Sequence, residues 1–265
     1  MPFGVLEGHV PRFRDYTSDT VSVLSMAKQK TNGGIAMYNV REIDPRSEAD
    51  QGIMSDIFRL RYRVFCEEKD WIPSHPDKVD IDEFDIPEAH HLACLSDKNE
   101  VLGYLRLLPT TGPYMLKDVF PVLLGGQAAP NDSCIYESSR FVIDSKKVRD
   151  RNHYSSIAGV TSALLIGLFK FARTKNMKAV VSVVDISVEK ILRRSGLATT
   201  RYAPPIKIGN CLAVAGYAEP SILNITSLEK KHGLEEEQAA TTPAAGDKIT
   251  RTEKFNKKFE IHESC

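Results

Sequence analysis

The chain has no excess of charge of either sign, because 35 lysines and arginines balance 35 aspartates and glutamates. This balance argues against a protein that coats nucleic acid through bulk charge, although a local basic patch is compatible with it. The five cysteines are scattered and form no CxxC pair, so the sequence predicts neither a disulfide framework nor a zinc site. Cysteine use of this kind is typical of a reducing, cytoplasmic compartment.

Long hydrophobic runs are also missing. Residues 1–16 contain no continuous apolar core of the kind that a signal peptide needs. The least polar stretch, residues 155–169, is interrupted by Ser, Thr and Gly and falls short of the roughly 20 apolar residues of a membrane-spanning helix. Its apolar residues recur at helical spacing, which predicts a buried core helix and no membrane segment.

Motifs that identify several common chemistries are absent: the phosphate-binding GxxxxGK, the nucleophile elbow GxSxG and the zinc-binding HExxH. The neighbouring His90 and His91 alternate faces of a predicted strand, so we do not expect them to share a metal. Cys66 lies beside Glu67 and Glu68, which disfavour a nucleophilic thiolate. The sequence therefore predicts no metal centre.

Strand and helix patterns alternate along the middle of the chain. Strands are predicted at 35–40, 91–96, 101–108, 135–143, 179–184 and 212–217, and helices at 49–70, 155–169 and 187–196. The polar turn 97–100 joins two of these strands into a hairpin, so the sheet is mixed. The patterns predict one α/β domain over residues 35–228, after a flexible extension (1–34) and before a charged, loosely packed tail (229–265).

Arginines stand inside apolar segments, where an unpaired charge would be costly. Arg61 and Arg63 lie within the apolar stripe of the first predicted helix, and Arg106 stands in the middle of a predicted strand. Asp82 and Asp85, in the loop that follows the helix, are candidate partners. Surface charge on both elements is the alternative interpretation.

Glu137 and Arg140 are three residues apart in another predicted strand. A regular strand would place them on opposite faces, whereas a bulge or bend would bring them into one site. The segment from Arg61 to Arg140 thus combines embedded arginines with several carboxylates. We interpret this combination as a polar cluster for an ionic substrate.

Two basic groups lie near predicted helices. Lys147 and Arg151 belong to the group that precedes the buried helix, and Lys190 and Arg194 lie one turn apart on the helix expected to begin at Ser187, its predicted N-cap. Solvated surface charge is one interpretation. A docking site for an acidic partner or a phosphate group is the other.

These segments closely resemble the LuxI-type acyl-homoserine-lactone synthases, which make bacterial quorum-sensing signals. The resemblance rests on stretches in register over roughly residues 35–221: LRYRVF (60–65), Trp71, DIDEFD (80–85), RLLPTTGPYML (106–116) with FP (120–121), and ESSRF (137–141). It implies a GNAT-like fold: a three-layer α/β/α sandwich with a mixed, twisted sheet and a substrate tunnel.

The resemblance also implies the reaction. S-adenosylmethionine, a substrate and not a cofactor, accepts an acyl group on its amine from acyl carrier protein or acyl-CoA, and then closes to the lactone with release of methylthioadenosine. The attacking amine must lose a proton, and Glu137, held by Arg140, is the catalytic candidate. The charged and aromatic positions of the S-adenosylmethionine site and its N-terminal lid match Arg61, Phe65, Trp71, Asp82, Asp85, Arg106 and Phe120.

For the acyl donor, the family's carrier-protein contacts match Lys190 and Arg194, a face that Lys147 and Arg151 would extend, and Ser182 is the best match in the acyl pocket. Two alternatives are a CoA-dependent GNAT-like N-acyltransferase that forms no lactone and a non-catalytic binding protein of the same fold. The missing pyrophosphate loop, Q/R-x-x-G-x-G/A, argues against the first. The intact charged cluster argues against the second.

Overall fold

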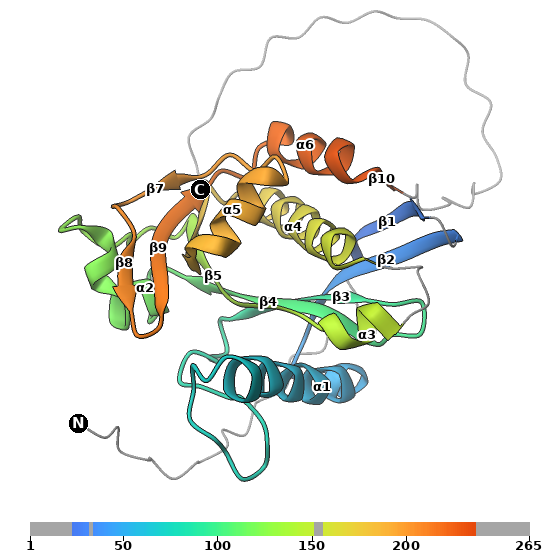
Figure 1. Cartoon of the computed structure of the whole chain (residues 1–265), viewed down its shortest axis with the longest axis horizontal. Coiled ribbons are helices and arrows are strands. Elements are labelled where there is room, and N and C mark those ends of the chain that lie inside the picture. Colours follow the sequence, from blue (N-terminus) through green and yellow to red (C-terminus); the bar gives the residue numbers. More distant parts are fainter. Residues whose placement is uncertain (1–22, 32–33, 151–155, 237–265) are drawn as a thin grey trace, which may run out of the picture.

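The computed structural model describes residues 23–31, 34–150 and 156–236. Their strands form one sheet in the order β10-β1-β2-β3-β4-β5-β6-β9-β7, with β8 paired to β9 (Figure 1). Only β5 and β6 run parallel to each other, so the sheet is mixed as predicted. The strands are β1 (Val23–Thr31), β2 (Gly34–Ile43), β3 (His90–Leu95), β4 (Val101–Pro109), β5 (Ile135–Ile143), β6 (Ala179–Asp185), β7 (Thr200–Arg201), β8 (Ile206–Ile208), β9 (Cys211–Ala218) and β10 (Leu234–Glu236).

Helices cover both faces of the sheet, which gives the predicted three-layer α/β/α sandwich (Figure 1). One face carries α4 (Ile157–Thr174), α5 (Ile186–Arg194) and α6 (Ile222–His232), and the other carries α1 (Gln51–Tyr62) and the short α2 (Met115–Asp118). The helix α3 (Ser145–Asp150) follows β5. Short helical turns are η1 (Glu48–Asp50), the π-helical η2 (Arg63–Glu68) and η3 (Pro121–Leu124).

The helix α4 forms the centre of the larger core. It is the only helix in the described ranges with the length and composition of a membrane span, and 72% of it is buried inside the protein. The predicted core helix is therefore confirmed. Gly167 lets α4 approach β2 closely, because a Cβ at this position would lie 2.4 Å from Cγ1 of Val40.

The folded unit extends beyond the predicted domain limits of 35 and 228. Strand β1 lies inside the segment predicted as an extension, and α6 continues to His232 and is followed by β10, which pairs with β1. The strand β1 carries few apolar residues; Ser25 and Ala27 are buried in it, and Lys30 is exposed. A strand of this polarity has no strong alternating pattern, so the sequence did not predict it. Residues 1–22 and 237–265 lie outside the described part of the chain.

Local details also differ from the expectations. The helix predicted over 49–70 divides into α1 and the π-helical η2. The N-cap of α5 is Asp185, whose side chain accepts the N–H of Ser187, and not Ser187 itself. Cys66, Cys94 and Cys211 are free thiols.

Candidate active site

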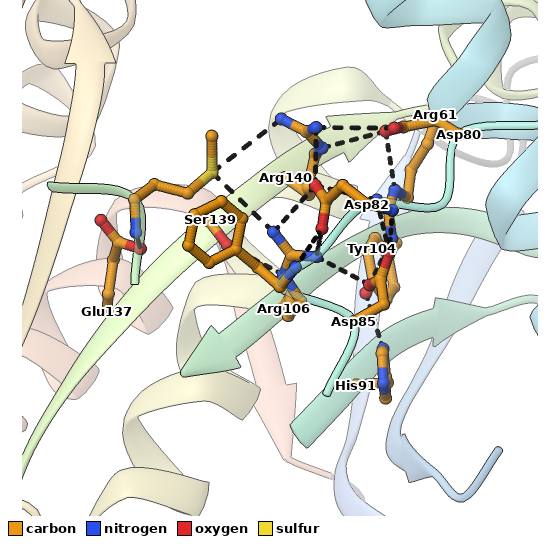
Figure 2. A network of polar contacts seen from close by, with 12 residues as sticks. Arg61, Asp80, Asp82, Asp85, His91, Tyr104, Arg106, Glu137, Ser139 and Arg140 are labelled. Atoms are coloured by element: carbon orange, nitrogen blue, oxygen red, sulfur yellow. Dashed lines mark hydrogen bonds and ion pairs between the residues drawn. The ribbon is translucent and has the colours of Figure 1, made fainter. Parts of the chain in front are cut away.

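Arginines and aspartates form a buried network between α1 and the sheet (Figure 2). Its members come from α1, the loop before β3, β4 and β5: Arg61, Asp80, Asp82, Asp85, Arg106 and Arg140. No side chain of the six is more than 12% exposed. Three positive charges face three negative ones, so each buried charge is compensated by its neighbours.

Arg61 and Arg106 are the fully buried centre of this network. Arg61 binds Asp85 through two hydrogen bonds of 2.8 and 3.0 Å and donates from Nε to Asp80 at 3.0 Å. Arg106 donates from Nη1 to Asp82 at 2.5 Å and to Asp85 at 2.7 Å. Burial would raise the pKa of Asp85, but the two arginines hold it well below its ordinary value.

The loop that carries the aspartates is fixed by its own backbone. The N–H of Asp80 donates to the carbonyl of Phe58 on α1 at 3.1 Å. The Asp82 side chain accepts the N–H of Phe84, and the Asp85 side chain accepts the N–H of Asp82. These turns direct the aspartates inward, as the buried arginines require. The predicted pairing of Arg61 with Asp82 and Asp85 is confirmed, and the surface interpretation is wrong for Arg61.

The positions of Arg63 and Asp80 differ from those that the sequence predicted. Arg63 is 29% exposed and binds Asp144 at 2.8 Å, outside the network. Asp80 is 5% exposed and contacts both Arg61 and Arg140, yet it was not among the predicted site residues. The only available signal was its place in the acidic loop, which cannot distinguish inward from outward carboxylates.

A β-bulge in β5 decides where Arg140 lies. The register with β4 shifts between Tyr104 and Arg106, and Arg140 has a φ of 53° in the left-handed region. The extra residue brings Arg140 to the same face of β5 as Glu137. A regular strand would place the two side chains on opposite faces. Arg140 then binds Asp80 at 2.9 Å and Asp82 at 2.7 Å.

The carboxylate of Glu137 lies apart from the arginines, at the start of α2 (Figure 2). It is 1% exposed and accepts the backbone N–H groups of Met115 at 2.8 Å and Leu116 at 2.7 Å. The predicted support of Glu137 by Arg140 is therefore wrong, because the α2 backbone holds this carboxylate. Met115 lies between the two residues: its backbone binds Glu137, and its sulfur is 3.9 Å from Nη1 of Arg140.

Burial raises the pKa of Glu137 to about 7, against the opposing effect of its two backbone hydrogen bonds. A carboxyl group with a pKa raised in this way has both its ionised and its protonated form within reach near neutral pH. It can therefore accept a proton there and hold it, which is what a general base at neutral pH requires.

A neutral pair lies beneath the network. The Tyr104 hydroxyl is 2.7 Å from Nδ1 of His91, and the two rings are stacked. Burial lowers the pKa of His91 to about 4, so it is uncharged at neutral pH. Sequence reasoning missed both residues, because buried polar residues on apolar strands carry no pattern that separates them from ordinary core positions.

Two of the three predicted aromatic residues lie beside the network. Phe65 and Trp71 are stacked with centroids 6.0 Å apart, and the guanidinium of Arg140 is 5.4 Å from the Phe65 ring. Trp71 is 49% exposed, and Nζ of Lys69 lies 5.9 Å from its ring centroid. Phe120 lies elsewhere: it packs among the apolar residues beneath α2.

The sheet opens between β5 and β6. Their pairing covers only Ile135–Glu137 with Ala179–Val181, after which β6 is paired to β9 alone. Ser182, the predicted acyl-pocket residue, is the first β6 residue beyond this pairing. It lies opposite Gly216 on the face that α4 and α5 cover, because the neighbouring Val181 belongs to the cluster on the other face.

The predicted basic face is formed only in part. Lys190 and Arg194 are both exposed and lie on one face of α5. Lys147 is on α3 and lines a hollow with Arg59 of α1. Helix α1 lies on the opposite side of the sheet from α5 (Figure 1). Lys147 therefore does not extend the α5 face, and Arg151 lies outside the described residues. Within those residues, no group of three His, Cys, Asp or Glu side chains could hold a metal ion.

Comparisons with known proteins find related sequences and structures. The family model described as autoinducer synthase matches residues 46–223. An acyl-homoserine-lactone synthase from Pseudomonas aeruginosa is 35% identical over 176 residues, which cover 66% of this chain and 86% of that protein. The crystal structure of the AHL synthase LasI matches with a TM-score of 0.65 and 32% identity, over 74% of this chain and 96% of that one. The CoA-dependent acyl-homoserine lactone synthase BjaI, solved with SAM and isopentyl-CoA, matches with a TM-score of 0.64 and 25% identity, over 72% and 87% of the two chains.

Proposed function

The chain belongs to the autoinducer synthase family, and on that premise we propose how this acyl-homoserine-lactone synthase uses its site. The amine of S-adenosylmethionine attacks the carbonyl of an acyl thioester, so that a C–N bond forms, the C–S bond breaks and the thiol leaves. The carboxylate of the acylated product then attacks its own γ-carbon and displaces the sulfonium. The products are the acyl-homoserine lactone and methylthioadenosine.

S-adenosylmethionine binds at the edge of the network where Arg140 and Asp82 lie. Their side chains are 12% and 11% exposed, the most accessible of the six. Arg140 would hold the carboxylate of the substrate, because guanidinium and carboxylate form paired hydrogen bonds. The sulfonium would lie against Trp71, whose exposed ring attracts a cation through its π face.

Glu137 is the general base that takes the proton from the attacking amine. Its raised pKa, of about 7, supports this role, and so does its position on the same face of β5 as Arg140. The observation that carries the proposed mechanism is geometric: the buried carboxylate of Glu137 and the guanidinium of Arg140 lie on one face of β5, and both contact Met115.

The acyl chain enters where β5 and β6 part. Strands that diverge inside a sheet leave room between their backbones, and Ser182 lies at the point of divergence on β6. The divergence begins directly after Glu137 on β5, so a thioester carbonyl placed there lies near the proposed base. We propose this opening as the substrate tunnel that the resemblance implies.

The experiment that tests the function is the identification of the product. Organic extracts of a host that expresses the chain are analysed by mass spectrometry for the homoserine-lactone fragment, and the purified protein is assayed for methylthioadenosine release with panels of acyl-carrier and acyl-CoA donors. Lactones and methylthioadenosine together support the proposal. Acylated S-adenosylmethionine without lactone would favour the simple N-acyltransferase, and no product with either panel would favour a binding protein.

The donor we propose is acyl carrier protein, which is acidic and would dock on the exposed cations of α5. Reversing both charges, in Lys190→Glu with Arg194→Glu, is expected to raise KM for the acyl-carrier donor at low salt by about tenfold, or ~1.4 kcal/mol of docking free energy. Steady-state assays at varied donor concentration measure this change.

A matched control is Lys230→Glu with Lys231→Glu, which makes the same change of charge on exposed residues of α6. KM should stay unchanged in this control. If the α5 variant has the KM of the wild type, or if both variants change KM equally, the carrier docks elsewhere.

A further inference from the structure

We propose that Arg201 is a positioning residue for the acyl donor: by binding Glu189 it holds α5 against the sheet in the orientation in which the carrier docks. The proposal rests on the proposed function, in which the acyl carrier binds the outer face of α5. It adds to that docking face a residue that lies outside α5, on the strand β7.

The Glu189–Arg201 pair has the geometry of a strong, specific contact. Nε of Arg201 donates to Oε1 of Glu189 at 2.6 Å, and Nη2 donates to Oε2 at 2.5 Å. Two parallel hydrogen bonds of this kind fix the relative orientation of the groups as well as their distance. The Glu189 side chain is only 5% exposed, so the pair is largely sheltered from solvent on its acidic side.

The pair links the docking helix to the part of the sheet that faces it. Arg201 lies opposite Gly216 of β9, and Gly216 lies opposite Ser182 of β6, so the three residues form one row on one face. Gly216 makes the close contact with β7 possible, because a Cβ there would lie 2.7 Å from the carbonyl oxygen of Thr200. Through Glu189, α5 is thus fixed to the row that contains the proposed acyl-pocket residue.

The pair also determines which charges α5 presents. Glu189 is buried, whereas Lys190 and Arg194 lie on the exposed side of the same helix. A second cation, Arg193, is 3.7 Å from the Glu189 carboxylate. Without Arg201, this buried carboxylate would keep only the longer contact with Arg193, and it would turn toward the cations of the helix. The loss of the Arg201 contact and the movement of the Glu189 carboxylate would both disturb the surface on which an acidic carrier docks.

The test is the variant Arg201→Gln, assayed for methylthioadenosine release with an acyl-carrier donor and an acyl-CoA donor of the same chain length. KM for the acyl-carrier donor is expected to rise about fivefold, while kcat and KM for S-adenosylmethionine stay within twofold of the wild type. With acyl-CoA, which makes no contact with α5 in the proposal, KM should not change. Arg201→Lys keeps the charge and loses the second hydrogen bond. Its KM for the acyl-carrier donor should lie between those of the wild type and Arg201→Gln.

The matched control is Lys207→Gln, which removes an exposed positive charge from the neighbouring strand β8. It should leave KM for the carrier donor unchanged. An equal rise in Lys207→Gln would mean general charge steering and would overturn the positioning role, as would an unchanged KM in Arg201→Gln. A fall of kcat with both donors would show a structural defect and overturn it as well.

The wild type distinguishes failure of this proposal from failure of the proposed function. If the wild type releases methylthioadenosine with the carrier donor and Arg201→Gln behaves identically, only the positioning role is wrong. If the wild type uses acyl-CoA and no carrier donor, the donor assignment is wrong and the role of Arg201 falls with it.

Discussion

Replacing Glu137 by glutamine is expected to lower kcat for methylthioadenosine release by roughly 10²–10⁴-fold, the usual contribution of a general base. The glutamine fills the same space but cannot accept a proton from the amine of S-adenosylmethionine. Its amide oxygen can accept one of the two backbone N–H groups, from Met115 or Leu116, that the carboxylate oxygens bind, so we expect the variant to fold with the loss of one hydrogen bond. Single-turnover acylation with purified protein measures the loss directly, because it separates the chemical step from product release.

The pH dependence gives an independent check of the same residue. The base form of Glu137 is the ionised one, and its pKa is raised to about 7 by burial. The rate of acyl transfer should therefore fall about tenfold for each pH unit below 7 and level off above it. In Glu137→Gln this dependence on Glu137 should be absent, and the residual rate should be flat across the same range.

Asp118→Asn is the matched control for this prediction. The Asp118 side chain accepts the N–H of Tyr114 at 3.0 Å, so it is a second carboxylate that caps the same short helix, but it is 39% exposed. Asp118→Asn should keep most of the activity and the wild-type pH profile. If it loses as much activity as Glu137→Gln, the carboxylates act only by supporting α2. Full activity in Glu137→Gln would remove Glu137 from the mechanism.

The sequence was informative where a physical requirement was local. An arginine in an apolar helix needs a partner, so Arg61 pointed to the nearby acidic loop, and the structure confirms Asp82 and Asp85 as its partners. The helical spacing of the apolar residues in 155–169 is also a local signal, and it identified the core helix α4. Neither inference needed to know how the strands are ordered in the sheet.

The sequence was uninformative where sheet geometry decides. Arg140 reaches the network only because a bulge adds a residue to β5, and the bulge is a property of the pairing with β4. Asp80 and Glu83 both belong to the acidic loop, yet Asp80 is buried and Glu83 is exposed. Which of them points inward depends on the backbone contact of the loop with α1, and no spacing rule carries that information.

Replacing Arg61 by leucine is expected to lower the free energy of unfolding by about 3–5 kcal/mol, because it removes one of the three positive charges that compensate the three buried carboxylates. Arg61 is fully buried and carries three hydrogen bonds to Asp80 and Asp85, and these side chains are themselves only 4% and 7% exposed. Urea unfolding of the purified variant measures the loss as a lower midpoint at an unchanged slope.

The control is Arg59→Leu, two residues earlier on α1, where the arginine is 64% exposed and 3.6 Å from Asp56. An exposed pair of this kind contributes about 0–1 kcal/mol, so Arg59→Leu should unfold close to the wild type. Equal effects of the two substitutions would show that Arg61 contributes only as a helix residue and not through its charge.

Lowering the pH should reduce the difference in the free energy of unfolding between the wild type and Arg61→Leu. In the wild type the arginines hold the pKa of Asp85 below its ordinary value, so this ion pairing stabilises the fold above the ordinary pKa and is lost as the pH falls. In the variant Asp85 keeps only Arg106 as a partner, so its carboxyl can take up a proton at a higher pH, which relieves the excess buried negative charge. The two unfolding free energies should therefore converge below about pH 4. A difference that is constant with pH would mean that lost packing, and not the loss of a compensating positive charge, destabilises the variant.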